Sequence, residues 1–164
     1  MRPATEQEIR ASFANCTQGE AKRLPMPRDL ADTPWPHLDF LGWRDLRAPD
    51  RAYLVAPRGD TLIGLMLRTA ATPKSLLRWN FCSLCLTTHQ AGGVTLMTAR
   101  KGGDAGRQGN SAGLYLCADL SCSQYIRGTK TPTTGARIEE SLTVEEQIER
   151  MVAKLGQFLH KLAV

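Results

Sequence analysis

The amino-acid sequence lacks the segments that would direct a chain out of the cytosol or into a membrane. Its opening, MRPATEQEIR, is polar and charged and has no apolar stretch of the kind found in signal peptides. No apolar run approaches the roughly 20 residues that a bilayer-spanning helix needs. We therefore expect a cytoplasmic protein with no membrane association, in a compartment where thiols stay reduced.

The sequence also has few of the patterns that mark enzymes. Its three histidines, His37, His89 and His160, are scattered, and neither paired carboxylates nor a Ser/His/Asp order stands out. The glycine-rich segment 101–113 lacks the G-x-x-x-x-G-K-[ST] spacing of a phosphate-binding loop, so we expect a flexible polar loop there. These absences predict a non-enzymatic binding protein with no small-molecule substrate.

Composition and capping patterns predict an α+β fold with helices at both ends. The chain has 164 residues with 14 glycines and 9 prolines, which suits one loop-rich domain. Capping boxes begin with Thr5 and Thr143 and predict a helix over 6–14 and an amphipathic C-terminal helix; a second short helix is expected around 20–24. The apolar stripe of the C-terminal helix consists of Ile148, Met151, Val152, Leu155, Phe158, Leu159 and Leu162.

Small antiparallel hairpins are predicted between these helices. The runs 52–56 and 61–68 read as strands joined by turn residues at 57–60, and a second pair is expected over 92–100 and 114–117. A short helix should follow the last strand. The preceding segment, 31–50, is rich in proline, aspartate and aromatic residues. We expect it to be an ordered loop anchored on the core by Phe40, Leu41 and Trp43.

Four of the five cysteines form two pairs with the pattern C-x2-C-x31-C-x4-C. These are Cys82 with Cys85 and Cys117 with Cys122. Zinc prefers four tetrahedral ligands, and structural sites often use four thiolates. The order of knuckle, hairpin and helix is that of a treble clef, which we place at about 78–130. The pattern predicts one structural zinc ion, because a closed four-thiolate site leaves no open position for catalysis.

The cysteine pattern has two alternative interpretations besides a metal site. A redox pair would need C-x-x-C to open a helix, but Cys85 is followed by Leu-Thr-Thr-His and a Gly-Gly turn. Four ordinary buried cysteines remain an alternative. His89 could replace one thiolate, but its position four residues beyond Cys85 predicts a surface side chain. Cys16, which has no local partner, is expected to be a small core residue.

The positive charge is unevenly distributed along the chain. Segment 68–137 holds nine lysines and arginines and two acids, whereas the rest holds twelve basic and fourteen acidic residues. We expect this charge around the cysteines, with Arg78, Lys101 and Arg127 as basic neighbours. Such a field suits nucleic acid or an acidic partner. It would equally compensate an anionic metal site, and the sequence leaves both open.

Three motifs resemble those of the elongation-factor-G-binding proteins of the fusidic-acid-resistance type, whose C-terminal part is a treble-clef zinc finger, also called fibronectin-binding-protein-like. They are DFLGWRD at 39–45, FCSLC at 81–85 and GLYLCADLSC at 113–122. The resemblance extends from about residue 21 to the C-terminal helix. It implies binding of elongation factor G, on the ribosome, with release from stalled ribosomes and fusidic acid tolerance.

The resemblance also implies which residues contact the factor. Phe81 and Tyr115 match the aromatics beside the zinc ligands, and Phe158 matches the one on the last helix, although its place on the apolar stripe leaves a core position open. A contact lysine of the family falls on Ala112, where Arg107 is the candidate substitute. The alternative function is that of a zinc-finger protein binding RNA or the ribosome through its basic lobe.

Overall fold

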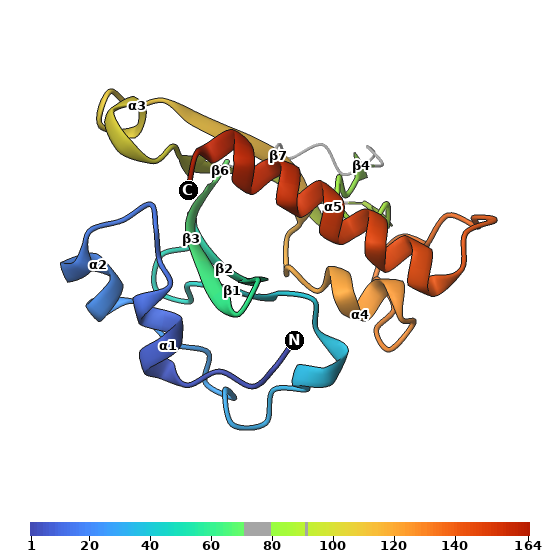
Figure 1. Cartoon of the computed structure of the whole chain (residues 1–164). Helices are drawn as coiled ribbons and strands as arrows, with labels where there is room; N and C mark the ends of the chain where they lie inside the picture. Colours follow the sequence, from blue (N-terminus) through green and yellow to red (C-terminus); the bar gives the residue numbers. More distant parts are fainter. Residues whose placement is uncertain (71–79, 91) are drawn as a thin grey trace.

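A five-stranded antiparallel sheet forms the centre of the protein. The computed structural model describes residues 1–70, 80–90 and 92–164. The strands are β1 (Leu41–Arg44), β2 (Arg51–Arg58), β3 (Thr61–Thr69), β6 (Val94–Arg100) and β7 (Ser111–Cys117). Their order across the sheet is β1-β2-β3-β6-β7, and each neighbouring pair is antiparallel. The α+β class with antiparallel hairpins predicted from the sequence is confirmed (Figure 1).

The β2–β3 hairpin forms as predicted, with Gly59 at φ 57° in its two-residue turn. The middle of β2, residues 52–56, is buried throughout, because both faces of the strand are covered. Leu54 belongs to a core cluster on one face, and Tyr53 to a second cluster on the other. A strand covered on both faces needs apolar residues at every position, which explains the unbroken run AYLVA.

Helices cover the two faces of the sheet. Helix α5 (Val144–Leu162) lies on one side, and α1 (Glu6–Ala11) and α2 (Gln18–Arg23) lie on the other (Figure 1). The buried positions of α5 include Met151, Leu155, Phe158 and Leu162, as the apolar stripe predicts. Val152 was assigned to that stripe but is 48% exposed. No helix among the described residues is long and apolar enough to cross a bilayer.

Helix α1 ends at Ala11, earlier than the predicted Ala14, because the following residues join the sheet. Gly64 donates its backbone N–H to Ser12 O, and Ala14 N–H donates to Gly64 O. The Asn15 side chain pairs with both backbone groups of Met66 on β3. A capping box at Thr17 then starts α2. Cys16 between the two helices is only half-buried, so the core position expected for it is wrong.

Segment 31–50 contains regular structure that the sequence analysis did not predict. It includes a 3-10 turn at Trp35–His37 and strand β1. Leu41 and Trp43 point into the second core cluster, and Phe40 packs into the first, so all three expected anchors are buried. The strand was missed because it is four residues long and flanked by prolines and aspartates, which usually signal loops.

The glycine-rich segment 101–113 was expected to be a flexible loop but contains helix α3 (Gly103–Arg107) and the start of β7. Gly102 N–H donates to Leu162 O at 2.7 Å, which ties this segment to the end of α5. A Cβ at Gly102 would lie 2.4 Å from Ala163 O, so only glycine allows this approach. Gly102 and Gly106 therefore permit close backbone packing, whereas Gly103 and Gly109 adopt positive φ with open space around them.

Candidate metal centre

The first cysteine pair lies on a knuckle closed by two very short strands. Strand β4 (Asn80–Phe81) pairs with β5 (Thr88–His89). Between them, Cys82 N–H donates to Thr87 O and Leu86 N–H donates to Cys82 O, both at 3.0 Å. Leu86 adopts a left-handed conformation at φ 56°, which lets the chain turn back sharply. This tight turn aims both cysteine sulfurs at one point.

The second pair comes from the end of β7 and the start of helix α4 (Cys122–Ile126). Leu120, at φ 58°, turns the chain between the two cysteines and donates its N–H to Cys117 O at 2.9 Å. The knuckle is attached to β7 because Ser83 N–H donates to Tyr115 O at 2.7 Å. Knuckle, hairpin and helix therefore meet in the predicted order.

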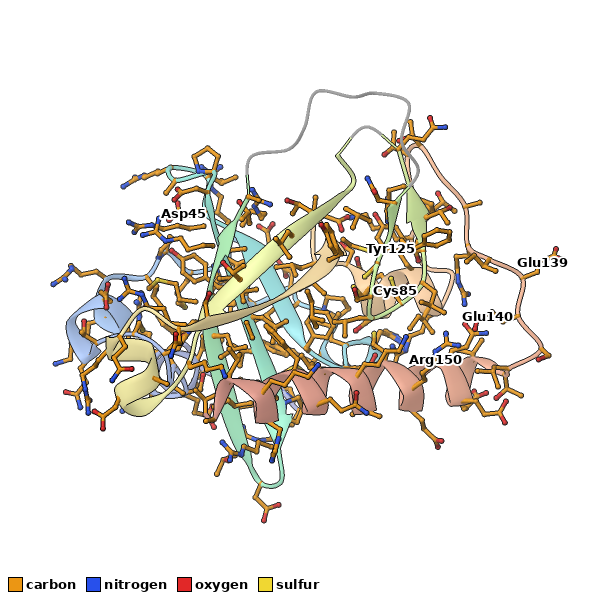
Figure 2. All side chains as sticks on the ribbon, turned by 90° about the horizontal axis from the view of Figure 1, so that it is seen from above. Asp45, Cys85, Tyr125, Glu139, Glu140 and Arg150 are labelled. Atoms are coloured by element: carbon orange, nitrogen blue, oxygen red, sulfur yellow. The ribbon has the colours of Figure 1, made fainter. Side chains whose placement is uncertain are left out.

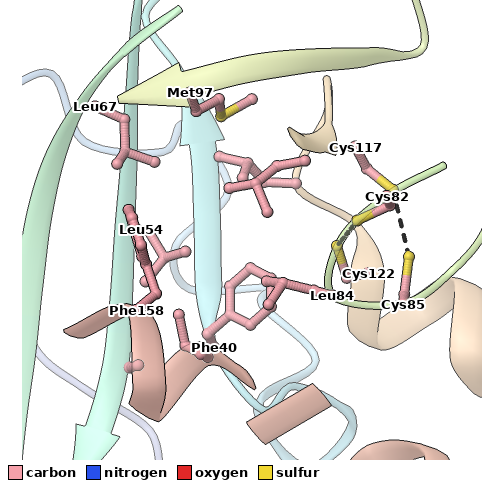
Figure 3. Packing of buried hydrophobic residues seen from close by; sticks show 14 of the residues in the cluster. Phe40, Leu54, Leu67, Cys82, Leu84, Cys85, Met97, Cys117, Cys122 and Phe158 are labelled. Atoms are coloured by element: carbon pink, nitrogen blue, oxygen red, sulfur yellow. Dashed lines mark hydrogen bonds between the residues drawn. The ribbon is translucent and has the colours of Figure 1, made fainter. Parts of the chain in front are cut away.

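All four sulfurs converge on one buried centre. The Cys82 and Cys122 Sγ atoms are 3.6 Å apart, those of Cys85 and Cys117 are 3.5 Å apart, and all four lie within 4.8 Å of one another. A zinc ion with Zn–S bonds of about 2.3 Å would set tetrahedral S–S distances of about 3.8 Å. Each cysteine is at most 2% exposed, beside the core residues Phe40 and Leu84 (Figure 3).

Four buried thiols so close together need a cation if all are to ionise. Hydrogen bonds, the largest contribution coming from Cys117 and the next from Cys122, hold the pKa of the Cys82 thiol well below its usual value. Hydrogen bonding to Cys117 raises the pKa of the Cys122 thiol well above its usual value. The four thiols therefore do not all lose their protons together, and a bound dication removes this conflict by stabilising four thiolates. The centre fits one structural zinc ion, as predicted.

His89 is not on the surface, as the sequence analysis expected, but beside the metal centre. Its side chain is 5% exposed, and Nε2 lies 3.4 Å from the Cys117 Sγ. The ring meets Tyr125 edge-on at a centroid distance of 5.2 Å, and burial lowers the pKa of the imidazole. Pairing of β5 with β4 turns this side chain inward. The spacing of His89 from Cys85 in the sequence does not indicate that β5 pairs with β4.

The DFLGWRD motif fastens the metal lobe to the sheet. The Asp39 carboxylate forms a two-pronged ion pair with Arg127, at 2.6 and 2.9 Å, and Asp39 N–H donates to Ser123 Oγ. A Cβ at Gly42 would lie 2.5 Å from Leu120 Cβ, between the second two ligands. Arg44 donates to Ala118 O. The motif therefore positions the loop that carries Cys117 and Cys122.

The basic residues near the cysteines are occupied by partners within the protein. Arg127 pairs with Asp39, Lys130 donates to Asp119 at 2.8 Å, and Arg137 donates to the Ile126 carbonyl and the Gln147 side chain. Lys101 lies in a groove away from the cysteines, and Arg78 falls outside the described residues. Of the basic neighbours expected around the cysteines, Arg127 therefore lies in the metal lobe but is paired, and Lys101 lies elsewhere.

The four residues expected to contact a partner do not form one surface. Phe81 is 55% exposed and Tyr115 is 54% exposed, and the Ser83–Tyr115 hydrogen bond joins the knuckle that follows Phe81 to the strand that carries Tyr115. Phe158 is 2% exposed within the first core cluster, which corrects its assignment to a partner contact. Arg107 lies in α3 at the far end of the β6–β7 hairpin and pairs with Asp104. It is not beside the aromatic residues.

A treble clef with four buried thiolate ligands defines a structural zinc-finger protein. Residues 8–162 match the family described as FBP C-terminal treble-clef zinc-finger, and the chain belongs to that family. No curated protein matches the sequence.

Among solved structures, that of the fusidic acid resistance protein FusC is similar, with 20% sequence identity and a TM-score of 0.48. The similarity covers 72% of this chain and 57% of the FusC chain, so the present chain spans less than two thirds of that protein.

Proposed function

We propose that this protein is a cytoplasmic, non-enzymatic binding protein whose partner is translation elongation factor G. Membership of the treble-clef family supports the proposal, together with the three motifs that resemble elongation-factor-G-binding proteins. The observation that carries it is the pair of exposed aromatic side chains, Phe81 and Tyr115, on the strands that lead into the zinc ligands.

The positions of these two rings suit a protein interface. Among the described residues they are the two exposed large aromatics, and large aromatic side chains commonly anchor interfaces. Phe81 directly precedes the ligand Cys82, and Tyr115 lies two residues before Cys117. The zinc ion fixes both backbones, so little conformational entropy is lost when a partner binds. Rigid exposed aromatics are expected to bind a preformed apolar pocket on the partner.

The resemblance also supports a role in releasing the factor from stalled ribosomes and in fusidic acid tolerance. Neither Phe158 nor Arg107 belongs to the proposed surface, because the first is buried and the second lies at the other end of the hairpin. The proposed contact is therefore smaller than the resemblance implies. It rests on Phe81 and Tyr115.

Calorimetric titration of purified elongation factor G with the parent protein, Phe81→Ala and Tyr115→Ala tests the proposal. Truncating a buried aromatic anchor typically costs 2 kcal/mol or more, so each variant should bind about thirtyfold more weakly or worse. Leu46→Ala is the matched control, because Leu46 is 73% exposed on the β1–β2 connection. Zinc content and melting temperature should be unchanged in all three variants.

Three results would count against parts of this proposal. Folded, zinc-loaded Phe81→Ala and Tyr115→Ala variants that bind as tightly as the parent would exclude the aromatic pair as the interface. Absence of any binding by the parent protein would exclude elongation factor G as the partner. A steep loss of affinity with salt would favour a charged contact over an aromatic one.

A further inference from the structure

A basic groove with a volume of about 590 Å³ lies between the N-terminal segment, the ends of β3 and β6, and helix α3. The side chains that line it include four cations, Arg68, Arg100, Lys101 and Arg107, and one carboxylate, Glu20. Figures 1 and 2 place α2 and α3 at one end of the molecule and the metal centre at the other. The groove is thus separate from the proposed aromatic surface.

The charge of this groove is incompletely neutralised within the protein. Arg68 pairs with Asp50 and Arg107 with Asp104, but all four of these side chains are more than half exposed, where ion pairs contribute little. Among the described residues, no carboxylate oxygen lies within 4.0 Å of a charged nitrogen of Arg100 or Lys101.

The single carboxylate in the lining already has partners. Glu20 accepts hydrogen bonds from the backbone N–H and the hydroxyl of Thr17, both at 2.8 Å, as the cap of α2. The Thr17 backbone hydrogen bond is the main reason why the pKa of Glu20 is lowered. This carboxylate therefore serves mainly the helix cap and offsets Arg100 only through a longer-range attraction, so Arg100 and Lys101 remain without a direct ion pair.

The rest of the lining favours a ligand recognised by its phosphates. Four glycines, Gly102, Gly103, Gly106 and Gly109, leave one wall without side chains, and the Ser111 hydroxyl supplies a neutral hydrogen-bonding group. No aromatic side chain is among the described residues that line the groove, so this lining offers no surface on which a base could stack. We therefore expect the groove not to recognise bases.

We propose that this groove binds the sugar–phosphate backbone of a nucleic-acid duplex. Arginine forks match phosphate oxygens well, and several cations along an open groove suit a ligand with repeated phosphates. Binding should be independent of base sequence and strongly dependent on salt. RNA and DNA duplexes present the same phosphate chemistry, and the experiment below separates them. The site is independent of elongation factor G binding.

Fluorescence anisotropy with a labelled 20-base-pair RNA duplex, and with a DNA duplex of the same sequence, tests the proposal. The test variant is Arg100→Gln/Lys101→Gln. The control is Arg28→Gln/Arg58→Gln, which removes equal charge from two exposed arginines outside the groove. Each lost phosphate contact lowers the log–log salt slope by about 0.9, so two lost contacts should weaken binding about sixtyfold at 0.1 M salt. The control should bind like the parent.

Tighter binding of one duplex identifies the preferred backbone, and equal binding shows that the sugar is not read. The proposal is overturned if the parent binds neither duplex at 50 mM salt. It is also overturned if both double variants lose affinity equally, or if ATP displaces the duplex at a similar concentration of phosphate groups. Alkylation of Cys16, which lines the same groove, gives a second readout without mutation. Bound duplex should slow it, and an unchanged rate would contradict the location.

Discussion

Replacing Gly42 by alanine should destabilise the metal lobe, although Gly42 lies on β1, outside that lobe. The added Cβ would lie 2.5 Å from Leu120 Cβ and 3.1 Å from a terminal methyl of the same side chain. Carbon atoms prefer separations of about 3.5–4.0 Å, so the two segments must move apart by about 1 Å. Leu120 cannot move freely, because its left-handed backbone connects Cys117 to Cys122. The strain is therefore transmitted to two zinc ligands.

Overpacking of this kind typically lowers the free energy of unfolding by about 1–3 kcal/mol. For a chain of this size, each kcal/mol shifts the melting temperature by about 2–4 °C. We expect Gly42→Ala to melt about 2–12 °C below the parent and to release zinc faster to a chromogenic chelator. Scanning calorimetry and the chelator assay measure the two effects separately.

Gly156→Ala is the matched control for this prediction. Gly156 lies within α5, and nothing is within 4 Å of the position of its added Cβ. Alanine favours a helix over glycine, so this variant should be more stable by about 0.5–1 kcal/mol with unchanged zinc release. A Gly42→Ala variant that keeps the melting temperature and zinc release rate of the parent would refute the reasoning about the close approach.

Three further predictions follow from the core and the metal lobe. Cys117→Ser should lose its zinc and lower the melting temperature; zinc content equal to that of the parent by elemental analysis would contradict the ligand set. Phe158→Ala should lower the free energy of unfolding by about 3–5 kcal/mol in urea titration, whereas an effect below 1 kcal/mol would contradict its core position. Glu140→Gln should destabilise the protein at pH 7, because hydrogen bonds from Arg150 lower the pKa of Glu140. Because the pKa of Glu140 is lower in the folded protein than its unfolded value of about 4.3, the ionised side chain stabilises the fold fully above about pH 4.3. The stability difference between Glu140→Gln and the parent should therefore vanish as the pH falls from about 4.3 through the folded-state pKa. A pH-independent difference would contradict the ion pair.

Features with local signals in the sequence were predicted well. The cysteine spacing predicted the metal centre, because knuckle and helix start each hold two ligands within a few residues. Turn chemistry at Gly59 and the capping box at Thr143 predicted the β2–β3 hairpin and the start of α5. In each case the residues that determine the structure are neighbours in the chain.

Features set by distant contacts were missed. Strand β1 exists because it pairs with β2, and its four residues alone show too little alternation. Gln147, a polar residue outside the predicted apolar stripe, is buried on α5 because its side chain donates to Leu142 O and accepts from Arg137. The basic residues were assigned to the metal lobe because they are near the cysteines in sequence. The β6–β7 hairpin instead carries Arg100 and Lys101 to its far end.

The burial of β2 on both faces has a consequence for how the hairpin finds its register. A one-residue slip normally exposes apolar side chains, but a strand with no polar face incurs little of that penalty. The two-residue turn at Gly59 and Asp60 must therefore fix the register of the hairpin, and one buried hydrogen bond contributes to the alignment of β2. Tyr53 donates its hydroxyl to the buried Asp45 carboxylate at 3.0 Å. In a slipped strand the Asp45 carboxylate would lose this donor, so the bond favours the native pairing of β2 with β1, while the turn sets the pairing of β2 with β3.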